Sequence, residues 1–326
     1  MAENEYILEV KNLCQHFSSG HGKNKMVVKA VDDVSFAVRR AETFGLVGES
    51  GCGKTTTGRT IIRLYDPTGG EVLFDGRDIS GKMTKDLRSY LTSNIAMIFQ
   101  DPIESLNPKM TIEEIVGEAP KVRGQKDRDE IHRQVVEMLE KVGLVEEHAT
   151  RYPHEFSGGQ RQRIGIARAI ITKPKLVIAD EPVSALDVSI QAQVINLLLD
   201  IQEKMKLTYI FVTHDLSVAK FISTNIMVMY LGQLVEFANA DELFNNPLHP
   251  YSKALLSAVP QLDIDNPMKR IPMAGEVTSP INPKPGCRFA ARCPYAKDIC
   301  HKKNPELWEY APGHTVACHF VEEINK

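Results

Sequence analysis

The sequence predicts an α/β fold with an antiparallel β region at its start and a helical region in its middle. The residues from Tyr6 to Phe36 are strand-like, with an alternating start at Tyr6–Val10 and a turn rich in Gly, His and Lys around Ser19–Lys25, which predicts the antiparallel region. A short apolar strand, Thr43–Val47, then runs into a glycine-rich loop and a helix that begins near Lys54. After Pro153, helical and buried-strand patterns alternate, as they do in α/β sheets. Together these patterns favour one main domain with an appendage.

The middle of the chain, between Asp101 and Pro153, predicts helices, with Gly143 as a candidate C-terminal stop. The apolar residues that recur there at helical spacing are Ile131, Val135, Met138, Leu139 and Val142. The alternating region that follows predicts the helix Gly159–Ile171, the strand Leu176–Ala179, the helix Ile190–Lys206, the strand Tyr209–Val212, and a hairpin of Ile226–Tyr230 and Leu234–Phe237.

Prolines become frequent beyond about residue 240, so long regular elements are not expected there. We therefore predict a domain boundary near Asn239. The main domain is predicted to span residues 1–239, with its helical part at about 101–155, and an extension is predicted to span residues 240–326.

Composition and charge disfavour two classes of protein. The chain has 326 residues, of which 43% are hydrophobic, enough to bury a full core. A net charge of -3 leaves no overall basic field of the kind that gathers nucleic-acid phosphates. The start has no basic segment followed by an apolar one, and apolar runs such as Ile195–Ile201 are too short to span a membrane. We therefore expect a cytosolic chain that binds no nucleic acid and reaches a membrane only through a partner.

The glycine-rich loop reads Gly48-Glu49-Ser50-Gly51-Cys52-Gly53-Lys54-Thr55 and fits the pattern of a phosphate-binding loop. Glycines let the backbone turn its N–H groups toward phosphates, and the following helix adds its positive N-terminal dipole. Lys54 is positioned to reach the β- and γ-phosphates of ATP, and Thr55 to bind Mg²⁺. Cys52 is interpreted as a small filler, and a chance glycine-rich turn is the alternative to the whole motif. The predicted ATP- and Mg²⁺-binding residues of the loop are Gly48, Ser50, Gly51, Cys52, Gly53, Lys54, Thr55 and Thr56.

Two carboxylates, Asp180 and Glu181, follow the apolar strand Leu176–Ala179. In an open α/β sheet, the carboxyl end of a buried strand lies beside the phosphate loop. Asp180 is predicted to hold the magnesium shell, and Glu181 to polarise the attacking water. By itself such a pair is more often part of a solvated loop, so the assignment depends on further motifs.

The pentapeptide Phe156-Ser157-Gly158-Gly159-Gln160 lies immediately before a predicted helix. Its backbone N–H groups and the Ser157 hydroxyl are therefore placed to meet a γ-phosphate. This pentapeptide resembles the signature motif of ABC-type ATPases, with Phe156 where the family usually has Leu. The resemblance implies a P-loop NTPase fold with a RecA-like core, an antiparallel β subdomain and a helical subdomain, followed here by a Cys-rich extension.

The resemblance assigns four further positions. Gln100 resembles the glutamine that senses magnesium and the transmembrane partner, and Asp187 the aspartate of a loop that crosses to the opposing subunit. His214 resembles the switch histidine that contacts the γ-phosphate, with a structural histidine as the alternative. Phe17 resembles the aromatic residue that stacks on adenine, with a core or strand-end aromatic as the alternative. The predicted catalytic residues are Lys54, Gln100, Glu181 and His214.

ABC ATPases work as pairs, in which each ATP lies between the phosphate loop of one subunit and the signature motif of the other. This chain has one of each motif, so the resemblance implies a second ATPase chain. The residues that would contact the ATP of that partner are Ser157, Gly158, Gly159, Gln160 and Asp187. ATP binding is expected to close the pair, and hydrolysis to release it.

Three segments resemble the ATPases of dipeptide and oligopeptide importers: Phe99–Pro108, Arg151–Glu155 and the tail from His249 to Cys318. Within that family the chain is most similar to the F-type subunit, which pairs with a homologous D-type subunit. The resemblance implies peptide import through two transmembrane permease subunits, served by an extracytoplasmic peptide-binding protein, with this chain at the cytoplasmic face of the inner membrane. An importer of nickel or another small solute is the main alternative. A nucleic-acid-associated ABC ATPase is disfavoured, because no long insertion separates the phosphate loop from the signature.

Four of the six cysteines lie in the last forty residues, at Cys287, Cys293, Cys300 and Cys318. In a reducing compartment such a group is more often a metal site than a set of disulfides. Five, six and seventeen residues separate successive cysteines. These separations are longer than those between the ligands of common structural zinc sites, which favours a metal centre larger than a single zinc ion. The family resemblance also implies a [4Fe–4S] cluster at these residues. Zn²⁺ and four unligated thiols are the alternatives.

Overall fold

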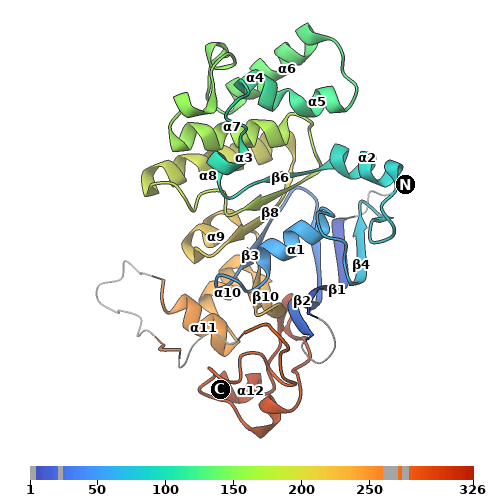
Figure 1. Cartoon of the computed structure of the whole chain (residues 1–326). Helices are drawn as coiled ribbons and strands as arrows, with labels where there is room; N and C mark the ends of the chain where they lie inside the picture. Colours follow the sequence, from blue (N-terminus) through green and yellow to red (C-terminus); the bar gives the residue numbers. More distant parts are fainter. Residues whose placement is uncertain (1–4, 21–24, 260–270, 274–278) are drawn as a thin grey trace. The chain divides into compact units, whose positions relative to one another are not determined.

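The computed structural model describes residues 5–20, 25–259, 271–273 and 279–326 (Figure 1). Among these residues, no helix has both the length and the apolar character needed to cross a membrane. The chain forms two compact units. The first unit comprises Met1–Val38, Thr43–Gly81 and Thr213–Lys326, and the second comprises Arg39–Glu42 and Lys82–Val212.

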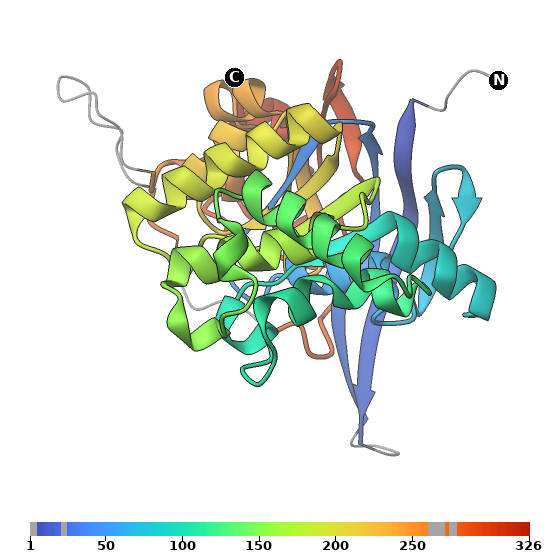
Figure 2. The ribbon, with the colours of Figure 1, turned by 90° about the horizontal axis from the view of Figure 1, so that it is seen from above.

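The first unit begins with an antiparallel sheet, as predicted. Its strands are β1 (Tyr6–Ser19), β2 (Met26–Arg39), β4 (Gly69–Phe74) and β5 (Arg77–Asp78), in the order β2-β1-β4-β5. The strands β1 and β2 lie side by side in both views (Figures 1 and 2). β1 pairs antiparallel with β4, with Leu8 opposite Phe74. The prediction of an antiparallel region is therefore confirmed.

Five other strands of the first unit form a mixed arrangement in the order β11-β12-β10-β9-β3. They are β3 (Thr43–Val47), β9 (Asn225–Tyr230), β10 (Gln233–Asn239), β11 (Trp308–Ala311) and β12 (His314–Val316). Every residue of β3 is buried, as expected for a strand covered on both faces of a sheet. β3 pairs parallel with β9, and β9 pairs antiparallel with β10, so the predicted hairpin is confirmed.

The helices of the first unit are short: α1 (Lys54–Ile61), α9 (Leu216–Ile222), α10 (Ala240–Asn245), α11 (Pro250–Leu256), α12 (Val321–Ile324) and the 3-10 turn η4 (Asp298–His301). Side chains of Asp215, Asn239 and His249 accept backbone N–H groups at the starts of α9, α10 and α11, which satisfies donors that a helix leaves unpaired. No described helix beyond residue 240 exceeds seven residues. The expectation that this proline-rich region lacks long elements is confirmed for its described part.

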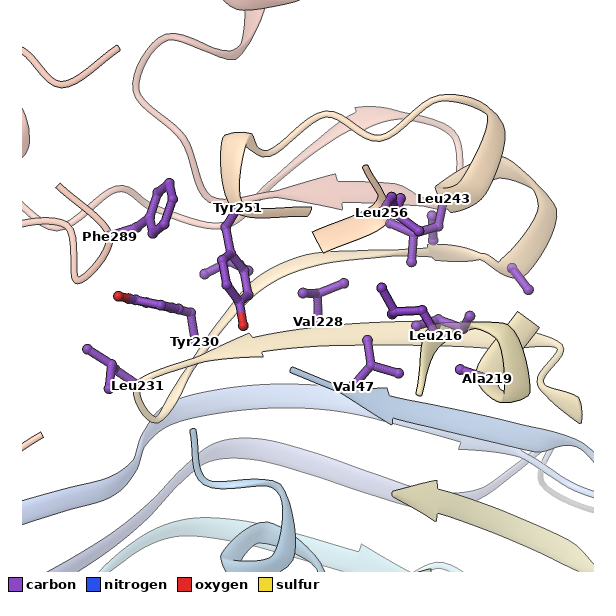
Figure 3. Packing of buried hydrophobic residues seen from close by; sticks show 14 residues of the cluster. Val47, Leu216, Ala219, Val228, Tyr230, Leu231, Leu243, Tyr251, Leu256 and Phe289 are labelled. Atoms are coloured by element: carbon purple, nitrogen blue, oxygen red, sulfur yellow. The ribbon is translucent and has the colours of Figure 1, made fainter. Parts of the chain in front are cut away.

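The core of the first unit joins the strand before the predicted phosphate loop to residues near the end of the chain. Val47 at the end of β3 and Val228 on β9 belong to the same buried cluster as Tyr251, Leu256 and Phe289. Figure 3 shows these side chains gathered between their elements. Because Tyr251 and Phe289 are almost wholly buried, the segment after residue 240 contributes directly to the core that supports the loop.

A buried carboxylate fixes the tail to β10. Glu236 is fully buried and accepts hydrogen bonds from the backbone N–H groups of Leu248 and His249, at 2.7 and 2.8 Å. Nε2 of His314 lies 2.8 Å from the same carboxylate. Burial alone would lower the pKa of His314, but the carboxylates of Glu236 and Glu242 outweigh it and raise that pKa. Glu236 thus joins β10, the start of α11 and β12.

The second unit contains three parallel strands in the order β8-β7-β6, and two of them, β7 and β8, match the predicted strands. They are β6 (Ile95–Ile98), β7 (Leu176–Asp180) and β8 (Thr208–Thr213). Every residue of β7 and β8 is buried. Their carboxyl ends consequently lie at one edge of this group of strands, where ligands bind in α/β sheets.

Helices account for the rest of the second unit: α2 (Lys85–Asn94), α3 (Pro102–Ser105), α4 (Ile112–Val116), α5 (Glu118–Val122), α6 (Arg128–Lys141), α7 (Gly158–Ile170), α8 (Val188–Met205) and the 3-10 turns η2 (Glu146–His148) and η3 (Pro153–Glu155). α7 packs against α3, α4, α6 and α8. Gly143, with φ of 74°, follows the end of α6. The predicted helical region and its glycine stop are both confirmed.

Candidate nucleotide-binding site

The predicted phosphate loop lies between β3 and α1 in the first unit. Gly48 and Gly53 have φ values of 151° and 109°, a region that favours glycine. A Cβ atom at Gly48 would lie 2.3 Å from the carbonyl oxygen of Met229, and one at Gly53 would lie 2.2 Å from that of Ala30. These glycines therefore let the loop rest directly on the backbones of β9 and β2.

Lys54 folds back over this loop. Its Nζ donates to the carbonyl oxygens of Gly48 at 2.8 Å and Glu49 at 3.0 Å. Cys52 is buried beside it, and burial raises the pKa of the Cys52 thiol although the charge of Lys54 opposes this. A neutral, buried thiol agrees with the interpretation of Cys52 as a filler. The loop and the first turn of α1 also contain Ser50, Gly51, Thr55 and Thr56.

Two more of the predicted ATP-contacting residues belong to the first unit. Phe17 on β1 is 38% exposed and meets Tyr65 edge to face, with ring centroids 5.3 Å apart. An exposed ring suits stacking on adenine better than it suits a core position. His214 directly follows β8 and is also exposed. His214 lacks the burial of a structural histidine and Phe17 that of a core aromatic, but the exposure of Phe17 near the end of β1 also fits a strand-end aromatic.

The second unit brings together Gln100 and Glu181, which are 81 residues apart in sequence. Nε2 of Gln100 donates to a carboxylate oxygen of Glu181 at 3.1 Å. Asp180, the last residue of β7, is almost fully buried, and Glu181 follows it at the strand's carboxyl end. The structure therefore buries the carboxylate of Asp180, whereas the carboxylate of Glu181 accepts a hydrogen bond from the Gln100 amide.

Glu181 has an unusual backbone. Its φ of 46° is left-handed, a conformation that costs a non-glycine residue about 1 kcal/mol. Its N–H donates to the carbonyl oxygen of Val212 at 2.9 Å, and its own carbonyl oxygen accepts from the N–H and hydroxyl of Ser184. The direction of the Glu181 side chain is therefore fixed by its neighbours on β8 and in the following turn.

The predicted signature motif begins α7. Ser157 is its N-cap: the hydroxyl accepts the N–H of Gln160, and the Gln160 side chain accepts the N–H of Ser157. This reciprocal capping box explains why the helix starts here. Gly158 and Gly159 form the first turn, and at Gly159 a Cβ atom would lie 2.5 Å from Ile190.

Two further predicted residues lie at the starts of α7 and α8. Phe156 is 4% exposed, so it supplies the apolar anchor expected from Leu in the family motif. Asp187 immediately precedes α8 and is exposed, and its side chain makes no capping bond to that helix. The Asp187 carboxylate is therefore not committed to starting α8.

The four C-terminal cysteines lie close together in the first unit. Burial raises the pKa of Cys287 to about 12, and the other three thiols add to that effect. In the opposite direction, a backbone N–H two residues further along favours the thiolate of three of them: Phe289 for Cys287, Tyr295 for Cys293 and Phe320 for Cys318. Such N–H contacts stabilise the charged form of a thiol, which is the form that binds metals.

Among the described residues, a different trio has metal-ligating atoms that all lie within 4.8 Å of one another: Cys14, His16 and Asp32. Asp32, however, already pairs with Arg288 and with Lys29, and Nε2 of His16 lies 2.9 Å from it. Because two cations neutralise this carboxylate, we interpret the group as an ion-pair network that holds Arg288 against β2.

Sequence reasoning missed one set of contacts at the phosphate loop. Glu49 forms an ion pair with Arg292, and its backbone bonds to Tyr251. Arg292 lies 243 residues further along the chain, so no local pattern predicts the contact. The one available signal is a carboxylate in a loop that is predicted to bind phosphates, where its negative charge calls for a compensating cation.

Comparison with known families identifies both parts of the chain. A model of the ABC transporter family matches residues 31–184, a range that includes the phosphate loop, the signature and Glu181. A model described as the C-terminal region of oligopeptide/dipeptide transporters matches residues 235–300. The second match begins in β10 and covers three of the four C-terminal cysteines.

The oligopeptide transport ATP-binding protein AppF of Bacillus subtilis (strain 168) is 53% identical over 323 residues, covering 98% of each chain. OppF of the same organism is 50% identical over 318 residues, covering 96% of each chain.

Among solved structures, cbiO1 from Clostridium perfringens, part of the ABC transporter complex cbiONQ, matches with a TM-score of 0.66 and 28% identity, over 74% of this chain and 92% of that one. The ATP-binding cassette MJ0796, dimeric in a post-hydrolysis state with ADP and Pi, matches with a TM-score of 0.64 and 28% identity, over 72% and 98%. The chain therefore belongs to the ATPases of ABC transporters, in the group that carries the oligopeptide/dipeptide transporter C-terminal region.

Proposed function

We propose that this chain hydrolyses ATP to drive the import of dipeptides or oligopeptides through a membrane permease. The observation that carries the proposal is the similarity, along 96–98% of the chain, to proteins named oligopeptide transport ATP-binding proteins. This similarity includes the segment after residue 235, which matches the C-terminal region of peptide transporters. The ATPase activity follows from the family, and the cargo follows from these relatives.

The site residues divide the work of hydrolysis. The barrier arises because negative charge builds on the transferred phosphoryl group and an attacking water must be aligned. Lys54 and the backbone N–H groups of the phosphate loop are suited to stabilise that charge, and Thr55 and Asp180 to hold Mg²⁺, which would neutralise the phosphate oxygens. Glu181, held by Gln100 at 3.1 Å, is suited to polarise the water. His214 would contact the γ-phosphate, and Phe17 the adenine ring.

A complete site needs a second ATPase chain, because this chain has one phosphate loop and one signature motif. The N-terminus of α7 presents Ser157 and the two glycines after it, which suit the γ-phosphate of an ATP held by a partner. Asp187 and the adjacent Val188, which is 82% exposed, suit a contact with that partner. Solved cassettes of similar fold are dimeric. We favour a homologous D-type subunit as the partner.

The remaining partners belong to the membrane. Two permease subunits would receive the movement of the ATPase pair, and an extracytoplasmic peptide-binding protein would deliver the cargo to them. The chain would then lie at the cytoplasmic face of the inner membrane as a peripheral subunit. The segment Leu106–Val116, which contains α4, is our candidate for the contact with the permease.

Affinity capture of the chain from a detergent extract is expected to recover two permease chains and a second ATPase. Cells without the chain should lose uptake of a labelled tripeptide, and wild type but not Lys54→Ala should restore it. If deletion of the chain abolishes nickel uptake and leaves peptide uptake unchanged, the cargo is nickel and the proposed peptide cargo is wrong. Recovery of DNA or ribosomes in place of permeases would contradict the transport function.

The four C-terminal cysteines are the proposed ligands of a metal centre, with [4Fe–4S] favoured over Zn²⁺. Four thiolates are a complete ligand set for either. Five, six and seventeen residues separate successive cysteines, more than the two to four that are common in structural zinc sites. This wider spacing along the chain favours the larger [4Fe–4S] centre over a single Zn²⁺ ion. Such a centre would cross-link the tail, and the redox chemistry that it can supply has no use among the ATP-site residues.

Anaerobically purified protein is expected to be brown and to contain about four iron atoms per chain, the content of a [4Fe–4S] cluster. Cys300→Ala should lose the iron, because it removes one of four ligands. Cys14→Ala is the matched control and should keep the iron, since Cys14 lies in the Asp32 network. Stoichiometric zinc without iron or sulfide would make the cluster assignment wrong and leave the ATPase function unaffected.

A further inference from the structure

Two residues from the segment after residue 240 hold Glu49, the second residue of the phosphate loop. Arg292 makes a bidentate ion pair with its carboxylate, with Nη1 2.8 Å from Oε2 and Nη2 3.1 Å from Oε1. The backbone N–H of Glu49 donates to the hydroxyl oxygen of Tyr251 at 2.9 Å. The tail therefore fixes both the side chain and the backbone of this loop residue.

Both tail residues are held in place by buried aromatic rings. The Arg292 side chain is 7% exposed, lies over the ring of Tyr230, and has its Nη1 3.4 Å from the Tyr230 hydroxyl. The rings of Tyr230, Tyr251 and Phe289 contact one another, with centroids 4.7 to 5.4 Å apart, and Figure 3 shows the three together. Close-packed rings leave few alternative rotamers, so the guanidinium and the hydroxyl stay where Glu49 needs them.

The ion pair matters because of what the loop binds. ATP brings several negative charges to the backbone N–H groups of the loop, and an unpaired carboxylate among them would repel it. The Glu49 side chain is 23% exposed, so water screens its charge only in part. Arg292 both neutralises the carboxylate and, through two parallel hydrogen bonds, fixes its direction.

We infer that Arg292 and Tyr251 are positioning residues of the phosphate loop, through which the C-terminal segment sets the affinity of the chain for ATP. The inference rests on the proposed role of the loop in ATP binding. It gives the tail a part in nucleotide binding through two side chains that are not themselves proposed metal ligands.

The test is a charge-rescue experiment on the full chain, with the equilibrium Kd for Mg·ATP measured by calorimetry. Arg292→Ala leaves Glu49 unpaired and is expected to weaken binding about tenfold, which corresponds to about 1.4 kcal/mol. The double variant Glu49→Gln/Arg292→Ala removes both charges and is expected to recover to within about threefold of wild type. Arg292→Gln also removes the charge but keeps more of the side chain, so it is the substitute variant if the alanine variant does not fold.

Two further measurements distinguish an electrostatic effect of Arg292 on ATP binding from a structural disturbance of the loop. The deficit of Arg292→Ala should shrink as KCl is raised from about 0.05 to about 0.5 M, because salt screens repulsion between carboxylate and phosphates. Its KM for ATP should rise while kcat changes little, since Gln100 and Glu181 are untouched. Tyr251→Phe keeps the ring but removes the acceptor of the Glu49 N–H, so it should weaken binding in the same direction by a smaller factor.

Arg288→Ala is the matched control, because Arg288 comes from the same segment and is equally buried but pairs with Asp32, outside the loop. It should lower thermal stability without a salt-dependent loss of ATP affinity. If the double variant binds as weakly as Arg292→Ala, the contact is merely structural and the inference is wrong. Lys54→Ala tests the loop itself: if it binds ATP as wild type does, the proposed role of the loop fails first.

Discussion

Replacing Glu181 with Gln is expected to lower the rate of ATP hydrolysis by about 10³-fold, the scale on which a general base contributes, while ATP still binds. Gln keeps the shape of the side chain and its place beside Gln100 but removes the charge that polarises the attacking water. The left-handed backbone of Glu181 is fixed by Val212 and Ser184, so the amide should point where the carboxylate did. The loss should therefore fall on kcat, and the ATP-bound pair of subunits should persist.

The measurement is phosphate release, with the partner's site separately inactivated, together with the stoichiometry of bound ATP. Glu203→Gln is the matched control, since Glu203 is an exposed carboxylate on α8 of the same unit. It should hydrolyse ATP at the wild-type rate. If Glu181→Gln does so too, another residue must align the water.

Replacing Glu236 with Ala is expected to lower the free energy of unfolding by about 3–5 kcal/mol, the usual cost of removing one partner of a buried ion pair. Glu236 accepts from two backbone N–H groups and from His314, all in the interior. Removing the carboxylate leaves these donors and the ring of His314 buried without their acceptor. The tail should detach from β10 before the rest of the first unit unfolds.

Chemical denaturation would measure this loss, and hydrogen exchange in β12 would report the local release. Glu242→Ala is the matched control, because the Glu242 side chain also approaches His314 but is 45% exposed. Its removal should cost far less stability than the removal of Glu236, as is usual for surface pairs. Equal losses in the two variants would mean that burial does not set the strength of the Glu236 contacts.

Sequence predicted best those parts of the molecule whose causes are local. The phosphate loop follows from adjacent residues, in which a strand, three glycines and Lys54 occur at fixed spacing. The start of α7 follows from the reciprocal bonds of Ser157 and Gln160, three residues apart. Gln100 and Glu181 were each identified from their motifs, but their direct bond depends on the parallel pairing of β6 and β7.

The contacts of the tail were not predictable, because their partners are far apart in the chain. Arg288 and Arg292 pair with Asp32 and Glu49 across 256 and 243 residues, and charged residues at these positions show no periodicity that would link them. Cys14, isolated in sequence, lies beside Asp32 only because β1 and β2 are neighbours. Tertiary packing alone decides these pairs.

The pairing of β10 with β12 has a consequence for any shortened form of the chain. β12 covers one side of β10, with Phe237 opposite Thr315, and β11 follows as a strand of only four residues. A polypeptide ending at Asn239 would leave the seven-residue β10 as an open sheet edge, with unpaired N–H and C=O groups available to any other strand. By pairing with this edge, β12 protects β10 from aggregation. A chain shortened at Asn239 would tend to pair its exposed β10 with strands of other molecules.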